Sequence, residues 1–354
     1  MTETNSLEKG WQNYAALFHE KASSARRGKS YIDACLKYAQ PIYFNGAPIV
    51  YDTKHFSRLV GYSEKYLFGA ANASSYFYRS FKVSKKSGDF RVIREPLPSL
   101  KSVQRWILDK ILYQIETNPA AKAYKKASSI KDNARFHVGQ DLVLSVDLVR
   151  FFDNIGTNRI YPIFRKLGYS KEVATLLANL CCYNGRLPQG APTSAALSNI
   201  VMIPFDNTLL GFCRSRGLRY TRYADDITIS GEFSKGQVIG YLRNLAARYG
   251  FSLNDKKTRI VGSWGRQQVT GIVVNERMQA PRNKRRKLRQ DLYFIKKFGL
   301  AAHALKTNQT KSYLAYSLLG EANFVLMINQ KDRIAAELKT LLVQSLNSTD
   351  PDSD

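Results

Sequence analysis

The chain has 354 residues and carries 54 Lys and Arg against 28 Asp and Glu, which gives a formal net charge of +26. Its apolar content of 44% is that of a folded protein and excludes a basic disordered tail. No apolar run has the length of a transmembrane helix, and the first residues lack a signal-peptide pattern, so the charge predicts a nucleic-acid partner and no membrane partner. Four cysteines without CxxC spacing indicate reduced thiols in a cytoplasmic protein.

The N-terminal part of the chain predicts helices followed by a β-hairpin. Residues 1 to about 70 look mainly helical, with a break marked by Pro41 and Pro48. From residue 76 to 93 the pattern becomes strand-like on both sides of a turn at 85–89. A long helix is expected next, and its apolar side comprises Leu100, Val103, Ile107, Ile111 and Leu112.

The central part predicts short strands between helices. An apolar strand covers residues 142–146 and ends at Asp147. Helices are expected over 156–182 and 193–213, and a hairpin follows near 218–229.

The C-terminal part predicts an amphipathic helix near 235–249, short strands around 259–262 and 268–274, and further helices. Residues 347–354 are expected to form an acidic disordered tail. After Pro281 a dense basic face lies above an apolar stripe, and so many charges of one sign indicate a surface that binds a polyanion. The basic face comprises Arg282, Lys284, Arg285, Arg286, Lys287 and Arg289.

Two adjacent carboxylates, Asp225 and Asp226, lie between β-forming runs, so we expect them at or beside the tip of a hairpin. Two carboxylates about 4 Å apart repel by roughly 4 kcal/mol at an effective dielectric of 20. On a chain this basic, such a pair of carboxylates is best interpreted as a binding site for divalent cations. Asp147 ends another strand, and the three acids converge if the two strands are neighbours.

A nucleotidyl transfer needs two Mg²⁺ ions, which a few carboxylates hold together with phosphates and water. We expect two Mg²⁺, or Mn²⁺ in their place. Because consecutive strand residues point to opposite faces, we assign Asp225 as the ligand shared with Asp147, and Asp226 as a partial or outer ligand. Asp153 lies too far along the chain to share this geometry and is expected in a turn or a cap.

Three segments, in this order, resemble successive motifs of reverse transcriptases: Ser145–Asp147 with Phe151-Phe152, Leu187–Ser194, and Tyr223–Asp226. The resemblance implies an RNA-directed DNA polymerase with Asp147, Asp225 and Asp226 as catalytic residues. It also implies an α+β right-hand fold of fingers, a palm of antiparallel sheet backed by helices, and a helical thumb. The implied regions are an N-terminal helical region at 1–75, fingers at 76–140, palm at 141–278 and basic thumb at 279–346.

The same resemblance assigns nucleotide-binding roles. Phe152 resembles the gate that blocks a 2′-hydroxyl and so selects deoxynucleotides; the alternative is a core residue, the role expected for Phe151. Gln189 and Gly190 resemble the loop that approaches the incoming base pair. Three cations complete the set: Arg91, which resembles the clamp on the triphosphate; Lys86, in the same clamp or in a solvated hairpin; and Lys257, a proton donor to pyrophosphate or a surface charge.

Two further signals narrow the family to the retron reverse transcriptases. Residues 133–137 match the NAxxH pattern upstream of the first catalytic acid, and residues 269–271 match the VTG pattern downstream of the hairpin. For His137 an RNA contact and a structural role both stay open. The residues assigned to RNA binding are Asn133, His137, Val269, Thr270, Gly271 and the basic face after Pro281.

A retron enzyme is implied to bind a structured non-coding RNA, to prime from a guanosine 2′-hydroxyl, and to use dNTPs to make branched RNA-linked single-stranded DNA (msDNA). An accessory effector protein and a role in anti-phage defence are implied as well. The alternatives are another bacterial reverse transcriptase, of the group II intron or non-retron defence type, and an RNA-binding scaffold that keeps the fold without synthesis.

Overall fold

The computed structural model describes residues 2–84, 88–125 and 128–347. The chain forms two compact units that alternate along the sequence, and the four regions expected from the sequence stay predictions. The first unit comprises Met1–Pro119, Val149–Asn207 and Ala246–Ser252. The second comprises Ala120–Leu148, Thr208–Leu245 and Leu253–Asp354.

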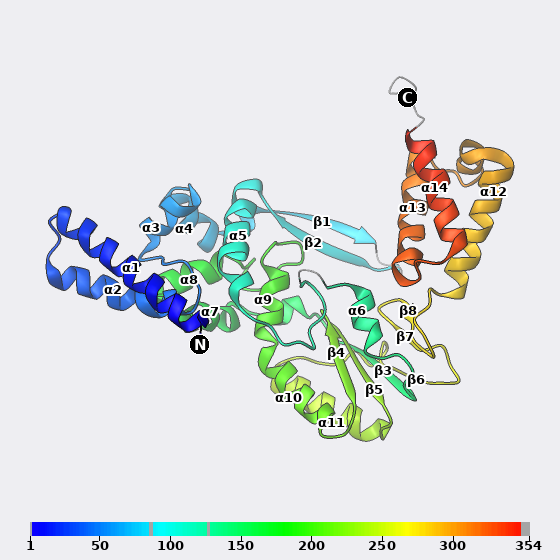
Figure 1. Ribbon diagram of the computed structural model, residues 1–354, viewed down its shortest axis with the longest axis horizontal. Helices are drawn as coiled ribbons and strands as arrows, with labels where there is room; N and C mark the ends of the chain where they lie inside the picture. The colour runs from blue at the N-terminus through cyan, green and yellow to red at the C-terminus, as the bar shows by residue number, and fades with distance from the viewer. Residues whose placement is uncertain (1, 85–87, 126–127, 348–354) are drawn as a thin grey trace. The chain divides into compact units, whose positions relative to one another are not determined.

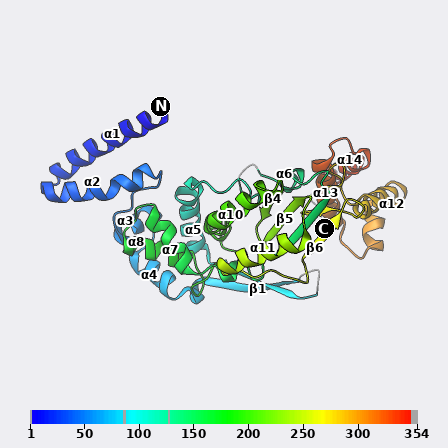
Figure 2. The same ribbon diagram turned by 90° about the horizontal axis from the view of Figure 1, so that it is seen from below.

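The first unit begins with a helical hairpin. Its helices α1 (Thr2–Ser24) and α2 (Lys29–Phe44) pack antiparallel, as Figure 2 shows. Aromatic rings join them: the ring centroids of Trp11 and Tyr43 lie 5.4 Å apart. The break predicted from Pro41 and Pro48 is confirmed, because α2 ends at Phe44 and the next helix begins at Thr53; Pro41 itself lies inside the last turns of α2. Only one amide donor is lost there, and the helix continues past it.

Two helices predicted as continuous are broken. The segment 156–182 divides at Gly168, whose φ of +105° is incompatible with a right-handed helix. The segment 193–213 bends by 51° between two helices. The remaining helices that begin in this unit are α3 (Thr53–Val60), α4 (Glu64–Asn72), α5 (Pro98–Lys110), α7 (Thr157–Lys166), α8 (Lys171–Leu180), α9 (Ser194–Val201) and α10 (Ile203–Arg214).

A two-stranded sheet completes the first unit and confirms the first predicted hairpin. Strand β1 (Tyr78–Ser84) pairs antiparallel with β2 (Phe90–Pro96), with Tyr78 opposite Pro96. The turn that holds Lys86 lies outside the described residues.

The second unit is built on a four-stranded antiparallel sheet with the strand order β4-β5-β3-β6. Its core includes Leu144, Ile227 and Ile229, all 0% exposed. The strand predicted before Asp147 and the hairpin predicted around 218–229 are both confirmed. The elements are α6 (Ile130–Arg135), β3 (Leu142–Asp147), β4 (Arg219–Tyr223), β5 (Asp226–Gly231), α11 (Lys235–Arg248) and β6 (Arg259–Gly262).

A small hairpin and three helices follow in the same unit. The helices lie side by side (Figure 1) and share a core with the hairpin, in which Val269, Leu288, Leu318 and Leu338 are buried. The first helix is interrupted at Gly299, where φ is +81°. The elements are β7 (Gln268–Val269), β8 (Ile272–Val273), α12 (Arg282–Lys306), α13 (Lys311–Ile328) and α14 (Arg333–Asn347).

Within the described parts of the chain, no single helix combines the length and the apolarity that a bilayer-spanning helix needs. The pair α9 and α10 meets both criteria only when counted together across its 51° bend. The predicted acidic tail, from residue 348 on, lies outside the described residues.

Candidate active site

The three acids predicted to be catalytic meet where β3 ends and β5 begins. The register of these strands places Asp147 directly opposite Asp226, and Asp225 occupies the turn before β5. The amide of Leu148 donates to the carbonyl oxygen of Asp225 at 3.0 Å, so the backbone ties the turn to the end of β3. The expected convergence of the two strands is therefore observed.

The register gives Asp226 a more central position than expected. Residues directly opposite in an antiparallel pair carry their side chains on the same face of the sheet, so Asp226 is the cross-strand neighbour of Asp147. The alternation argument fails here because the flat strand stops at Ala224, whose φ is +59°. Which acid shares a cation with Asp147 stays a prediction.

The electrostatics confirm that the carboxylates act on one another. Burial, followed by the negative charges of Asp225 and Asp147, raises the pKa of Asp226 to about 6. The Asp226 side chain is exposed to solvent, so the surrounding protein atoms remove only part of its hydration. A site that holds back the ionisation of its own carboxylate is one where a cation binds favourably.

Lys257 supplies a cation to this cluster. Its Nζ donates to Oδ2 of Asp147 at 2.9 Å, and Nδ2 of Asn254 donates to Oδ1 at 3.2 Å. The hydrogen bond to Asp147 raises the pKa of Lys257, and the charges of Asp225 and Asp226 add to the effect. Lys257 thus lies beside the acids, and its role as a proton donor to pyrophosphate stays a prediction.

The donor set fits a divalent cation. Carboxylate oxygens are the ligands that Mg²⁺ prefers, and a bound divalent cation would offset both causes of the raised pKa of Asp226, the loss of hydration and the repulsion by Asp225 and Asp147. Across the residues that the structure describes, no group of three His, Cys, Asp or Glu side chains is arranged as a metal site. In the present arrangement, the Lys257 ammonium neutralises part of the charge instead.

Arg222 is a residue of this site that the sequence analysis missed. It is 0% exposed, and its Nη1 donates to the carbonyl oxygen of Ala224 at 2.9 Å, which fixes the turn that carries Asp225. Its backbone bonds to Ala120 and Lys122, each at 2.8 Å, along the outer edge of β4. The sequence did contain a signal. Arg222 is two residues from Tyr220 and so points to the same, buried face of β4, where a charged side chain is costly unless it is hydrogen-bonded.

The structure corrects the RNA-contacting role that was left open for His137. The residue is 0% exposed; its Nδ1 and Nε2 are each 2.7 Å from a hydroxyl, those of Ser230 and Thr221. Burial, followed by the charges of Arg219 and Lys122, lowers its pKa to about 3. His137 is therefore a neutral cross-link between β4 and β5.

Two other residues assigned to RNA binding are also buried. Asn133 and Val269 are each 1% exposed, and Val269 belongs to the core beneath α12. Thr270, with φ of +45°, donates its hydroxyl to the carbonyl oxygen of Ile130 at 3.3 Å. In this group Gly271 is exposed. The motif at residues 269–271 therefore mainly builds the β7–β8 hairpin, because Val269 packs in the core and Thr270 bonds to Ile130.

The basic face of α12 divides into two groups. Arg285 lies 3.2 Å from Asp332, Lys287 lies 3.2 Å from Glu321, and Lys284 stacks over a ring of α13, so these three face the neighbouring helices. The other three cations are exposed and lie on one helical stripe at spacings of four and three residues: Arg282, Arg286 and Arg289.

Of the described residues assigned to the nucleotide, Lys257 lies in the second unit, and the others lie in the first. Phe151 is 2% exposed, which confirms its core role, whereas Phe152 is partly exposed. The centroids of these two rings lie 5.3 Å apart. Arg91 is exposed on β2. Asp153 lies in a 3₁₀ turn, as expected.

The loop with Gln189 and Gly190 packs against β2. The amide of Arg94 donates to the Gln189 carbonyl oxygen at 2.7 Å. Gly190 has φ of +120°, and a Cβ there would lie 2.8 Å from the Arg94 carbonyl oxygen. Glycine is therefore required by the approach of two backbones.

Residues 83–318 match the family described as reverse transcriptase (RNA-dependent DNA polymerase). The chain is similar to the Retron Ec86 reverse transcriptase of Escherichia coli, with 33% identity over 71% of this chain and 80% of that protein. It is also similar to the Retron Mx65 and Mx162 reverse transcriptases of Myxococcus xanthus, with 37% and 30% identity over 61% and 68% of this chain. These alignments span 55% and 57% of the two Myxococcus proteins.

Among solved structures, telomerase from Candida albicans, in complex with a fragment of telomeric RNA, aligns with a TM-score of 0.44 and 11% identity. The alignment covers 77% of this chain and 64% of that one, and we draw no functional parallel from it.

Proposed function

The chain belongs to the retron reverse transcriptases, which are RNA-directed DNA polymerases, and from this premise we propose what it copies. It binds one structured non-coding RNA, primes from the 2′-hydroxyl of a guanosine in that RNA, and makes branched RNA-linked single-stranded DNA. It works in the cytoplasm, where enzyme and product restrain an accessory effector protein in anti-phage defence. The net charge of +26 supports the RNA partner.

The observation that carries the proposal is the cluster of Asp147, Asp225 and Asp226 at one strand end, with Lys257 bonded to Asp147. A scaffold that only binds RNA has no use for three repelling carboxylates, because their repulsion opposes folding. A polymerase needs them to gather cations where the new bond forms.

We assign Asp147, Asp225 and Asp226 as the residues that would hold two Mg²⁺ ions, which Mn²⁺ can replace. When bound, the ions lower the pKa of the attacking hydroxyl and stabilise the charge of the triphosphate. The oxygen of that hydroxyl gives its proton to water and forms a bond to the α-phosphorus, and the bond from this phosphorus to pyrophosphate breaks. Lys257 is protonated at neutral pH, since Asp147 raises its pKa, and it donates a proton to the departing pyrophosphate.

Substrate selection falls to the first unit in this proposal. Phe152, the exposed partner of a buried ring, excludes a 2′-hydroxyl, and Arg91 binds the triphosphate. Gln189 and Gly190 hold their loop against β2 and so set where the incoming base pair lies.

The exposed stripe Arg282, Arg286 and Arg289 is proposed to grip the RNA–DNA duplex. Such contacts go to phosphates and read shape, so they need no base code. Two other cations of the basic face pair with residues behind the stripe, Lys287 with Glu321 of α13 and Arg285 with Asp332 directly before α14.

The test is to sequence the nucleic acid that co-purifies with the protein from its native host, with and without a debranching enzyme. We expect single-stranded DNA joined to the 2′-oxygen of one guanosine, which debranching releases. Linear DNA alone would identify another type of bacterial reverse transcriptase, and RNA without DNA would identify a scaffold.

A further inference from the structure

Trp264 lies on the turn between β6 and β7 and is 84% exposed. An indole with so little buried surface adds little to folding stability. Trp is enriched among the side chains that contribute most to binding at interfaces, so an exposed Trp is a candidate contact for a partner.

The turn holds this ring in one place. The amide group of Asn275 donates to the carbonyl oxygens of Ser263 and Gly265 at 2.9 and 2.7 Å, and its Oδ1 accepts from the Gln267 amide at 3.1 Å. A Cβ on Gly262 would overlap the six-membered ring of Trp264, so the indole rests directly on this backbone. Apart from this contact the indole is largely open to solvent.

The surroundings of the indole are basic. Arg266, Arg277 and Arg282 are exposed and line the same cavity as Trp264, together with a single acid, Glu276. The cavity has a volume of about 380 Å³, within the range of about 300–1,000 Å³ that small ligands occupy. Helix α12 begins at Arg282 without a side-chain cap, so its partial positive charge adds to that of the arginines.

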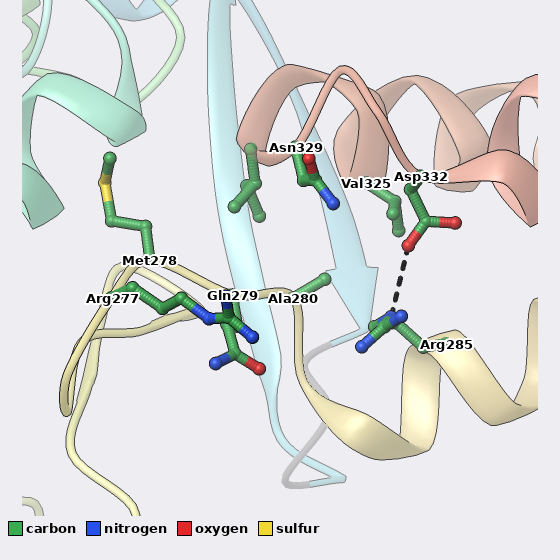
Figure 3. A pocket seen from close by; sticks show the side chains of 9 residues that line it. Arg277, Met278, Gln279, Ala280, Arg285, Val325, Asn329 and Asp332 are labelled. Carbon is green, nitrogen blue, oxygen red and sulfur yellow. Dashed lines mark ion pairs between the residues drawn. The ribbon is translucent and has the colours of Figure 1, made fainter.

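The wall behind these cations is firmly held. Residues 277–280 separate this cavity from a second one of about 250 Å³, which Figure 3 shows. Arg285 and Asp332 both line the second cavity and form an ion pair, dashed in Figure 3, with 3.2 Å between Nε and Oδ2. This pair joins the first turn of α12 to the start of α14. Arg282 therefore projects from a rigid element.

We propose that Trp264 is a stacking platform for one unpaired nucleobase of RNA, with Arg266, Arg277 and Arg282 binding the phosphates beside it. This site rests on the proposed RNA partner and adds to it a contact that distinguishes loops from duplex. Aromatic rings and guanidinium groups bind splayed-out bases of single-stranded loops, whereas paired bases leave no face to stack on. An acidic peptide would form ion pairs with the arginines but would have no aromatic group to stack on the indole.

The test compares the full chain with Trp264→Ala and with Trp264→Phe, which keeps a flat ring. The matched control is Tyr316→Ala, since this ring on α13 is 64% exposed and lies outside the cavity. The probes are a synthetic RNA hairpin with an unpaired loop, a blunt RNA duplex of the same stem, and heparin.

We expect Trp264→Ala to weaken hairpin binding by about 10-fold, with duplex and heparin binding unchanged. Trp264→Phe and Tyr316→Ala bind the hairpin like the wild type. The hairpin also quenches the fraction of wild-type fluorescence that is missing in Trp264→Phe. Equal hairpin affinities of Trp264→Ala and the wild type overturn the proposal, and so does an equal loss for all three probes.

A second readout separates this proposal from the polymerase function. Extension of a DNA primer is measured at a saturating concentration of RNA template, where template affinity does not limit the rate, so Trp264→Ala retains the wild-type rate. A wild-type protein that fails to extend the primer contradicts the polymerase function and leaves the hairpin comparison valid. A loss of extension in Trp264→Ala alone overturns the platform, because the indole would then serve the reaction or the fold.

Discussion

His137 offers a prediction that can be worked out in magnitude. Burial lowers its pKa from 6.5 to about 3, so in this pH interval the unfolded chain binds a proton that the native protein excludes. The stabilising contribution is present in full above pH 6.5 and is lost as the pH falls towards 3. At 1.36 kcal/mol per pH unit the loss is about 2–3 kcal/mol at pH 4.5.

The perturbation is His137→Gln, which removes this titration and leaves Ser230 or Thr221 without its imidazole partner. At pH 7.5 we expect it to lower the free energy of unfolding by about 1–3 kcal/mol. At pH 4.5 this difference should shrink, or reverse, by about 2–3 kcal/mol, because only the wild type carries the buried imidazole.

Urea unfolding of both proteins at the two pH values measures the change, and the other titrating groups cancel in the comparison. His19→Gln, at an exposed position of α1, controls for the substitution itself. A cost of His137→Gln that stays constant between pH 7.5 and 4.5 would refute a neutral, buried imidazole.

Three further predictions concern packing, selection and RNA binding. Gly190→Ala should lower the free energy of unfolding by about 2–4 kcal/mol, because its Cβ meets β2 and its φ is +120°; an unchanged urea midpoint would contradict this. Phe152→Val should raise ribonucleotide incorporation by about 10-fold in single-nucleotide extension, whereas Phe151→Ala should instead cost about 3–5 kcal/mol of stability. Arg286→Glu should weaken binding to an RNA–DNA duplex by about 10-fold and reduce its salt dependence, whereas Arg285→Gln should leave affinity nearly unchanged and cost about 1 kcal/mol of stability. Equal affinity losses in these last two variants would remove the distinction between exposed and paired cations.

The local features of the site were predictable from the sequence. The strand that ends at Asp147 and the hairpin that carries Asp225 both have signals within a few residues, namely apolar alternation and a polar turn. Family motifs then supplied Lys257, which the structure places on Asp147.

Features that depend on distant segments were not predictable in this way. The pairing of Asp147 with Asp226 follows from a register between segments about 80 residues apart, and the break at Gly168 interrupts an apolar periodicity that continues on both sides. The burial of His137 is set by tertiary packing, so its motif alone left two roles open. Trp264 gave no signal at all, because local sequence does not tell an exposed indole from a buried one.

Primer extension tests the central claim most directly. The wild type, Asp225→Asn with Asp226→Asn, and the control Asp153→Asn are each given an RNA template, an annealed DNA primer, dNTPs and Mg²⁺. We predict extension by the wild type and the control and none by the double variant, with RNA binding retained in all three. Extension by the double variant, or none by the wild type, would contradict the assignment of these carboxylates as the polymerising centre.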